Sequence, residues 1–163
     1  MIYYICVTEN LPDETWRLTH LGRLLAMACA RFDARVLALM AHDKDLTLAL
    51  SHLAARGTLT ASHTQITRHL PLAGCSLTEL AGRAGVTKQA MGKLVDQCAA
   101  WDLVQRAPHP RDARALRVLF SPTGRLWLAA YQLAVEQAQA EFSLAVGNDV
   151  ATVVHLGLEA YAT

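Results

Sequence analysis

The side chains with the most readily interpreted chemistry lie on one short stretch in the middle of the chain. Residues 87–93 read TKQAMGK, and threonine, lysine and glutamine side chains bind the phosphates and base edges of DNA. The glycine would let the backbone approach a ligand closely, and a helix that begins here would offer free N–H groups to a phosphate. We therefore predict a DNA-binding face made by Thr87, Lys88, Gln89, Gly92 and Lys93.

A second basic segment follows, with the sequence RAPHPRDAR at residues 106–114. Residues 103–107 and 115–120 on either side are typical of strands, and the second run alternates as a strand with one buried side does. The pattern predicts a hairpin with a loop over residues 108–114. A basic loop beside a DNA-reading helix is placed to put an arginine into the minor groove, and its candidate residues are Arg111, Asp112 and Arg114.

Two short helices and a tight turn are needed to present the first of these segments. Ser76 and Glu79 have the S-x-x-E spacing of a capping box, which predicts a helix start. Gly85 supplies a residue that tolerates positive φ in the turn, and Thr87 is the expected N-cap of a helix over 88–100. The predicted buried stripe of that helix is Ala90, Leu94 and Cys98, with Met91 and Val95 beside it.

Taken together, these motifs resemble the MarR family of transcriptional regulators. The resemblance rests on GVTKQAMGKLVDQ at 85–97, on RAPHPRDAR at 106–114 and on SPTGR at 121–125. It implies a winged helix-turn-helix in which Asp112 and Arg114 occupy the D-x-R positions of the wing tip. It also implies a homodimeric transcriptional repressor that binds a pseudo-palindromic operator in double-stranded DNA. A small aromatic or anionic effector would release it, bound near Phe32, Arg35, His52, His63 and Trp127.

The composition is that of one soluble domain with surplus apolar surface. The 163 residues are 53% hydrophobic and 18% charged, and a buried subunit interface would account for the surplus. The net charge is only +1, but the segment from Arg83 to Arg125 holds eight basic and three acidic residues, which leaves −4 on the rest. This distribution is typical of a DNA-binding face on a near-neutral body. Because no transmembrane run or signal peptide is evident, we expect a cytoplasmic protein without a membrane partner.

We expect a mainly α fold with a small β-wing, folded as a single domain over residues 1–163. The winged helix-turn-helix lobe would span 60–121, and the segments 11–42 and 122–162 would be dimerisation helices. The first is predicted as one helix from Pro12 to about Met40. Its apolar seam suits packing on a partner helix or, alternatively, within one chain, and comprises Leu18, Leu21, Leu25, Ala28, Phe32 and Leu39.

The other connecting segments are read from their periodicity and their helix stops. Residues 42–57 fit either a strand or a helix, and residues 1–8 fit either a strand or an arm on a partner. A short helix is predicted over 60–70, before Pro71. After the wing, a helix over 122–146 should end at Gly147, before a last helix that ends near Tyr161. The predicted apolar faces are Trp127, Tyr131, Val135, Ala138, Phe142 and Ala145 in the first, and Val150, Val154, Leu158 and Tyr161 in the second.

Other chemistry finds little support in the sequence. We expect no enzymatic activity and no cofactor, because the known nucleotide-binding, nucleophile and zinc-protease motifs are missing. We expect no metal, since the four cysteines form no C-x-x-C pair and the histidines lack i, i+4 spacing. Two alternatives remain: a redox-responsive regulator acting through Cys75, which precedes a helix N-terminus, or a winged-helix module that binds a protein instead of DNA.

Overall fold

The computed structural model describes residues 15–43, 48–55, 59–109 and 112–162. Its elements confirm a mainly α fold with one small antiparallel sheet, in the strand order β1-β3-β2. The predictions for residues 1–8 and for Arg111 fall outside the described residues. In chain order the elements are α1 (Thr15–Thr19), α2 (Leu21–Ala41), α3 (Leu48–Ala55), α4 (Ala61–His69), β1 (Cys75–Ser76), α5 (Leu77–Arg83), α6 (Lys88–Ala100), β2 (Val104–His109), β3 (Asp112–Phe120), α7 (Pro122–Val146) and α8 (Asn148–Ala162).

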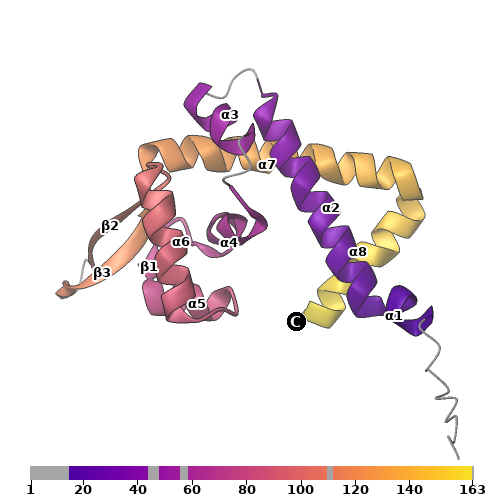
Figure 1. Ribbon diagram of the computed structural model, residues 1–163, viewed down its shortest axis with the longest axis horizontal. Helices are drawn as coiled ribbons and strands as arrows, with labels where there is room; N and C mark the ends of the chain where they lie inside the picture. Colours follow the sequence, from indigo (N-terminus) through magenta and orange to yellow (C-terminus); the bar gives the residue numbers. More distant parts are fainter. Residues whose placement is uncertain (1–14, 44–47, 56–58, 110–111, 163) are drawn as a thin grey trace, which may run out of the picture.

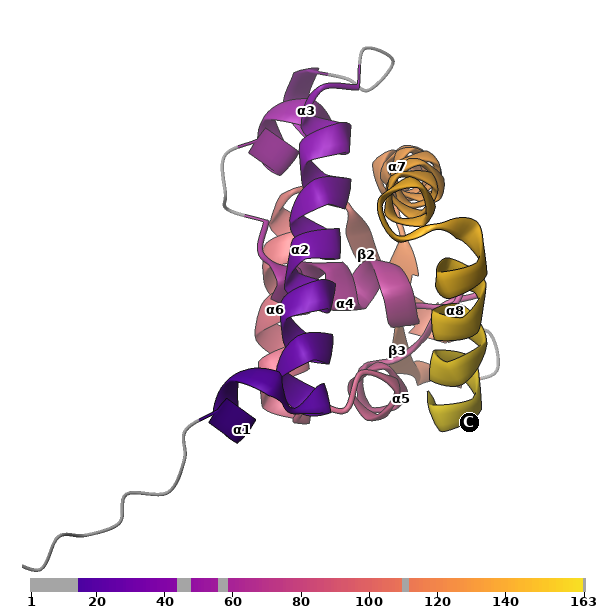
Figure 2. The ribbon, with the colours of Figure 1, turned by 90° about the vertical axis from the view of Figure 1, so that its right-hand side faces the viewer.

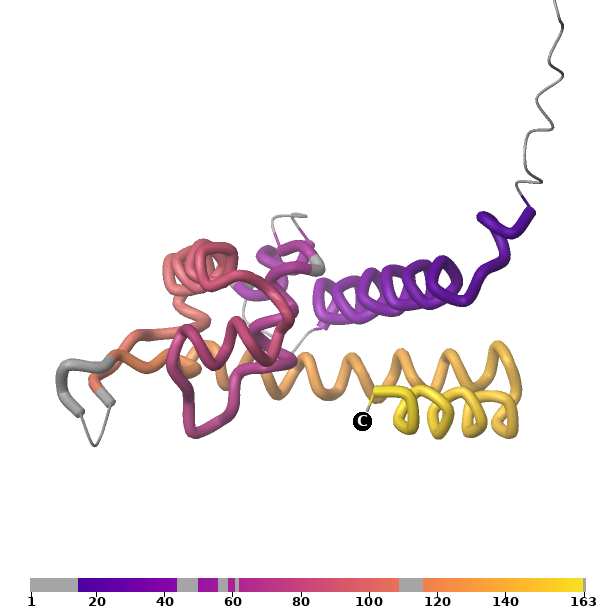
Figure 3. The backbone as a smooth tube through the Cα atoms, turned by 90° about the horizontal axis from the view of Figure 1, so that it is seen from below, coloured from indigo at the N-terminus to yellow at the C-terminus, as the bar shows by residue number. Residues whose placement is uncertain are grey.

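The elements separate into a lobe and a set of long helices. Figure 1 shows α4, α5, α6 and the sheet gathered at one end, with α7 running from the lobe across the molecule. In Figure 1, α2 crosses α7 steeply and contacts it, and α8 descends from the far end of α7. Seen from below in Figure 3, α8 runs back toward the lobe under α7. No helix among the described residues is both long enough and apolar enough to span a bilayer.

The helix-turn-helix forms as its sequence signals predict. Ser76 caps α5 by accepting a hydrogen bond from the Glu79 backbone N–H at 3.1 Å, while the Glu79 carboxylate accepts one from Arg83 at 2.8 Å. Gly85 lies in the turn with φ of 65°. Thr87 caps α6 by accepting from the Ala90 N–H at 3.2 Å, and α6 has the predicted limits.

The buried stripe of α6 differs from the predicted one. Met91, Val95 and Cys98 are buried, whereas Ala90 is exposed and Leu94 is half-buried. The helix is therefore rotated so that its larger apolar side chains enter the core. Burial of Met91 and Val95 removes more apolar area from water than burial of Ala90 could.

The wing is longer than predicted, because its strands extend into the expected 108–114 loop. Strands β2 and β3 stay paired as far as His109 and Asp112, with a register shift at Pro108, which has no N–H to donate to the ladder. Val118 and Phe120 are buried as the alternation predicts, whereas Leu116 is 57% exposed.

The predicted N-terminal helix over 12–40 is wrong as a single element. His20 separates α1 from α2 with an extended backbone, and its Nδ1 atom accepts a hydrogen bond from the Arg23 N–H at 3.2 Å. This side-chain cap starts α2 anew. In the 42–57 segment the helix alternative is confirmed by α3, and α4 agrees with the predicted 60–70 helix.

The long helix α7 has the predicted limits but a partly different buried face. Trp127, Tyr131 and Ala138 are buried as expected, together with Ala130 and Ala134. The predicted face fails at Phe142, which is 38% exposed. The buried residues of α7 end at Ala138, because the C-terminal part of the helix extends past the lobe.

A close backbone approach fixes the junction between the wing and α7. Ser121 caps α7 by accepting from the Gly124 N–H at 2.8 Å, and its own hydroxyl donates to the Asp102 carbonyl. A Cβ atom on Gly124 would overlap the Leu103 carbonyl oxygen, because the two atoms would lie well within their van der Waals contact distance. Only glycine therefore fits at this position.

We predict that Gly124→Ala lowers the free energy of unfolding by roughly 2–3 kcal/mol, since the backbone at Leu103 must move to admit the methyl group. Urea unfolding followed by circular dichroism measures the change. The control is Gly82→Ala on α5, where a Cβ meets no atom within 4 Å. That substitution should leave stability unchanged or raise it by up to about 1 kcal/mol. Equal effects of the two substitutions would contradict the close approach.

Candidate DNA-binding surface

The first turns of α6 present the predicted DNA-contacting residues on the surface of the lobe. Thr87, Lys88, Gln89 and Lys93 are all exposed. Gly92 is half-buried, and a Cβ there would lie 3.7 Å from the Leu77 side chain. The predicted residues of α6 therefore share one accessible region.

The wing candidates are only partly placed. Asp112 and Arg114 belong to β3, whose pairing with β2 carries them to the end of the hairpin, but their side chains lie outside the described part. Arg111 lies outside it altogether. Their assigned roles at the wing tip stay predictions.

A groove separates the start of α6 from the wing, and its walls are rich in cations. It has a volume of about 300 Å³. Lys88 of α6 lines it together with Arg106 of β2 and Arg117 of β3, so three separate elements bring positive charge to one concavity. The remaining lining residues are Ser76, Leu77, Thr78, Leu116 and Val118.

Arg106 and Arg117 also fix the wing against the helices. Arg106 Nη1 lies 2.6 Å from Asp96 Oδ1 on α6. Arg117 Nη1 donates to the Ala73 carbonyl at 3.0 Å, while its buried Nε has no hydrogen-bond partner in the structure. Sequence reasoning counted Arg117 only as part of a basic segment. Its place on β3, paired with β1 at Ser76, brings it to the groove.

A histidine of α4, His63, forms a hydrogen bond to α6. The Thr60 N–H donates to His63 Nδ1 at 3.1 Å, so that atom is the acceptor, and Nε2–H donates to Gln97 Oε1 at 2.8 Å. The imidazole also packs on Trp101, with ring centroids 4.9 Å apart. His63 therefore caps α4 and ties it to α6.

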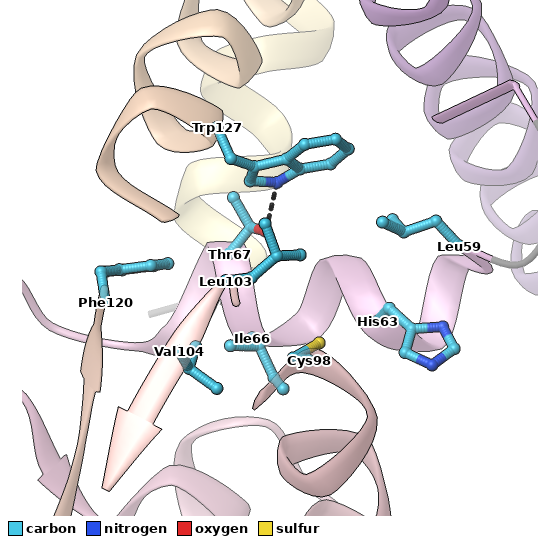
Figure 4. Close-up of a pocket in the computed structure, with 9 residues that line it drawn as sticks. All are labelled: Leu59, His63, Ile66, Thr67, Cys98, Leu103, Val104, Phe120 and Trp127. Carbon is cyan, nitrogen blue, oxygen red and sulfur yellow. Dashed lines mark hydrogen bonds between the residues drawn. The ribbon is translucent and has the colours of Figure 1, made fainter. Parts of the chain in front are cut away.

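The structure brings together only two of the five predicted effector-binding residues. His63 and Trp127 line one small cavity of about 10 Å³, which is no larger than one water molecule needs (Figure 4). Trp127 Nε1 donates to Thr67 Oγ1 at 3.3 Å and is thereby engaged in the core. Phe32 is half-buried on α2 and His52 is exposed on α3.

Arg35, the fifth of these residues, binds α7 instead of lining that cavity. Its Nε and Nη2 atoms donate to the two carboxylate oxygens of Glu141 at 2.6 and 2.7 Å. The hydrogen bonds from Arg35 and Gln137 lower the pKa of Glu141 to about 2. The pair is therefore fully charged at neutral pH and links α2 to α7.

Cys75 does not have the environment of a redox-active thiol, which corrects the sequence interpretation. It precedes α5 as expected, but its side chain points into the core and is only 5% exposed. Burial and then the charge of Glu79 raise the pKa of this thiol, so the nucleophilic thiolate is disfavoured. Cys98 is buried in the core as predicted, and burial raises its pKa to about 12. Among the described residues, no group of three His, Cys, Asp or Glu side chains could hold a metal.

Comparisons with known proteins agree on one family. Residues 59–115 match the MarR family model, while no curated protein matches the chain significantly. The regulator BldR from Sulfolobus solfataricus superposes with a TM-score of 0.60 at 22% identity, covering 93% of this chain and 97% of that one. Rv2887 from Mycobacterium tuberculosis, solved with salicylic acid, gives 0.59 at 26% identity, with coverages of 88% and 96%.

CouR from Rhodococcus jostii RHA1, solved with p-coumaroyl-CoA, superposes with a TM-score of 0.60 at 18% identity. The match covers 89% of this chain and 93% of the CouR chain. The shared fold thus extends over nearly the whole length of each protein. The family model covers the part that builds the helix-turn-helix and most of the wing. The motifs and the family match together identify residues 59–115 as a winged helix-turn-helix of MarR type, and the shared fold extends the likeness over nearly the whole chain.

Proposed function

We propose that the protein is a homodimeric repressor that binds a pseudo-palindromic operator in the cytoplasm. The observation that carries this proposal is the exposed N-terminal face of α6 beside a groove lined by three cations. Among the described residues, an alternative protein-binding role has no comparable feature in its favour, since a cation-lined groove beside an exposed helix N-terminus suits phosphate recognition.

On duplex DNA, α6 would enter the major groove and the wing would reach the flanking minor groove. Gln89 would contact base edges, since its amide can both donate and accept. Lys88 and Lys93 would hold phosphates. Thr87 would also hold one, because its hydroxyl accepts the cap bond from Ala90 and keeps its own hydrogen to donate. Arg114, oriented by Asp112, would enter the minor groove.

A second copy of the chain would cover the exposed apolar surface of the long helices. Figure 2 shows α2 and α8 extending to the same side of α7, and each carries large apolar side chains that are at least 40% exposed. Monomeric proteins rarely expose so much contiguous apolar surface, and homodimer interfaces typically bury it. Pairing here would present two α6 helices to successive major grooves, about 34 Å apart. The residues are Leu18, Leu21, Leu24 and Met27 on the first two helices, and Val150, Val153, Val154, Leu156, Leu158 and Tyr161 on α8.

A small aromatic or anionic effector would release the operator. The support is that Rv2887 was solved with salicylic acid and CouR with p-coumaroyl-CoA. The five effector candidates are distributed over α2, α3, α4 and α7, and a site among them would need the partner subunit to complete it. Titration calorimetry of the purified dimer with salicylate tests this proposal, and the absence of heat would count against it.

We predict that Gln89→Ala lowers affinity for the operator by roughly 1–3 kcal/mol and relaxes base preference at the contacted position. The matched control is Lys93→Ala on the same helix, which should weaken binding to all sequences alike and reduce the salt slope by about 1. Fluorescence anisotropy on the upstream intergenic DNA and on a scrambled duplex, at several salt concentrations, measures both effects. If Gln89→Ala changed neither affinity nor preference, Gln89 would not read bases.

We also predict that Leu21→Glu or Val153→Glu converts the dimer to a monomer at micromolar concentration, because a carboxylate would be desolvated in the interface. Analytical ultracentrifugation measures the mass. Leu72→Glu is the control, since Leu72 is 76% exposed on the turn before β1, away from the long helices. A wild-type protein that sediments as a monomer would rule out the dimer outright.

A further inference from the structure

An ion pair between a buried carboxylate and a partly exposed arginine joins the lobe to the long helix α2, and the side chain of Arg68 is 28% exposed. Asp33 on α2 is only 5% exposed, and its Oδ1 atom accepts a hydrogen bond from Arg68 Nη2 on α4. Its other oxygen, Oδ2, lies 3.8 Å from the Cys29 thiol, which donates to it. A carboxylate this deeply buried is costly unless a cation is held against it, so the two helices are constrained to keep this contact.

Helix α4, which carries Arg68, forms hydrogen bonds to α2, α6 and α7. Burial opposes a rise in the pKa of Arg68, yet Tyr131 on α7 and Asp33 together raise it, so the guanidinium interacts with both long helices. One residue earlier, Thr67 accepts the hydrogen bond of Trp127 on α7. At its other end, His63 binds Gln97 on α6. Helix α4 therefore links the long helices to the helix that carries the DNA-contacting residues.

The other ion pair of α2 provides a contrast. Arg35 and Glu141 join α2 to α7, and their side chains are 48% and 33% exposed. An exposed pair of this kind contributes little because solvent and salt screen it. It joins α2 to α7, whereas the Asp33–Arg68 pair joins α2 to α4.

We infer that Asp33 and Arg68 are positioning residues that set the placement of α6 relative to the dimerising helices. This inference rests on the proposed function, because placement matters only when two α6 helices must fit one operator. Shifting one half-site by a base pair moves it about 3.4 Å and turns it by about 35°. A lobe held rigidly by the ion pair discriminates against that shift, whereas a loosened lobe tolerates it.

The test uses Asp33→Asn, which keeps the shape of the side chain and removes its charge. Affinity for the operator with natural half-site spacing should fall about tenfold, while affinity for duplexes with one base pair added or removed should hardly change. Base preference at the position read by Gln89 should stay intact, which a partly unfolded lobe would not allow. Glu141→Gln, the control that breaks the other ion pair of α2, should leave the spacing preference as it is in the wild type.

A double-mutant cycle shows whether the two residues act as a pair. If they do, Asp33→Asn combined with Arg68→Gln should cost no more affinity than Arg68→Gln alone. Additive losses would show that each residue acts separately and would overturn the inference. An unchanged spacing preference in Asp33→Asn would overturn it as well.

A distance measurement without DNA separates this inference from the proposed function. Nitroxides attached through ketone-bearing amino acids at the exposed positions Arg31 on α2 and Ala100 on α6 report the spread of the α2–α6 distance by pulsed electron paramagnetic resonance. Asp33→Asn should broaden the distribution of distances, and Glu141→Gln should not. Broadening in a protein that fails to bind DNA would support the positioning role and refute the regulator. Unchanged widths of the distance distribution in a protein that binds DNA would refute the positioning role and support the regulator.

Discussion

The arrangement depends on how closely the end of the wing approaches α7. Ser121 caps α7 and also binds the Asp102 carbonyl, and Gly124 lets the helix backbone rest against Leu103. These contacts remove the freedom that a flexible connection would leave between β3 and a 25-residue helix. The lobe and the long helix are therefore packed as one unit, so the position of α7 determines the position of α6.

Helix α4 completes this unit with polar contacts in the interior. Apolar packing alone tolerates small rotations, since it is non-directional. The hydrogen bonds from His63 and to Thr67, and the pairing of Arg68 with the buried Asp33, have fixed partners and directions. Leaving any of these groups unpaired would cost free energy. The core thus supplies stability, and these contacts on α4 fix the orientation of the surrounding helices.

Several elements were predictable from sequence because local chemistry decides them. Ser76, Gly85 and Thr87 fix the ends of α5 and α6 through backbone hydrogen bonds and a positive φ, and Pro122 and Gly147 bound α7 in the same way. The predictions failed where contacts with residues distant in sequence determine the structure. The wing strands are longer than predicted because hydrogen-bonded pairing between β2 and β3 continues past Pro108. Phe142 is exposed because α7 extends beyond the lobe.

The sequence by itself determined the helix-turn-helix, the wing and their likeness to the MarR family, since caps, turn glycines and the charged motif act within a few residues of one another. The tertiary structure alone decided which polar groups meet. It buried the Cys75 side chain of β1 in the core, separated the effector candidates, brought Lys88, Arg106 and Arg117 to one groove, and paired Asp33 with Arg68. Contacts between residues far apart in the chain depend on helix rotation and packing, and periodicity does not encode either with enough accuracy to place a side chain.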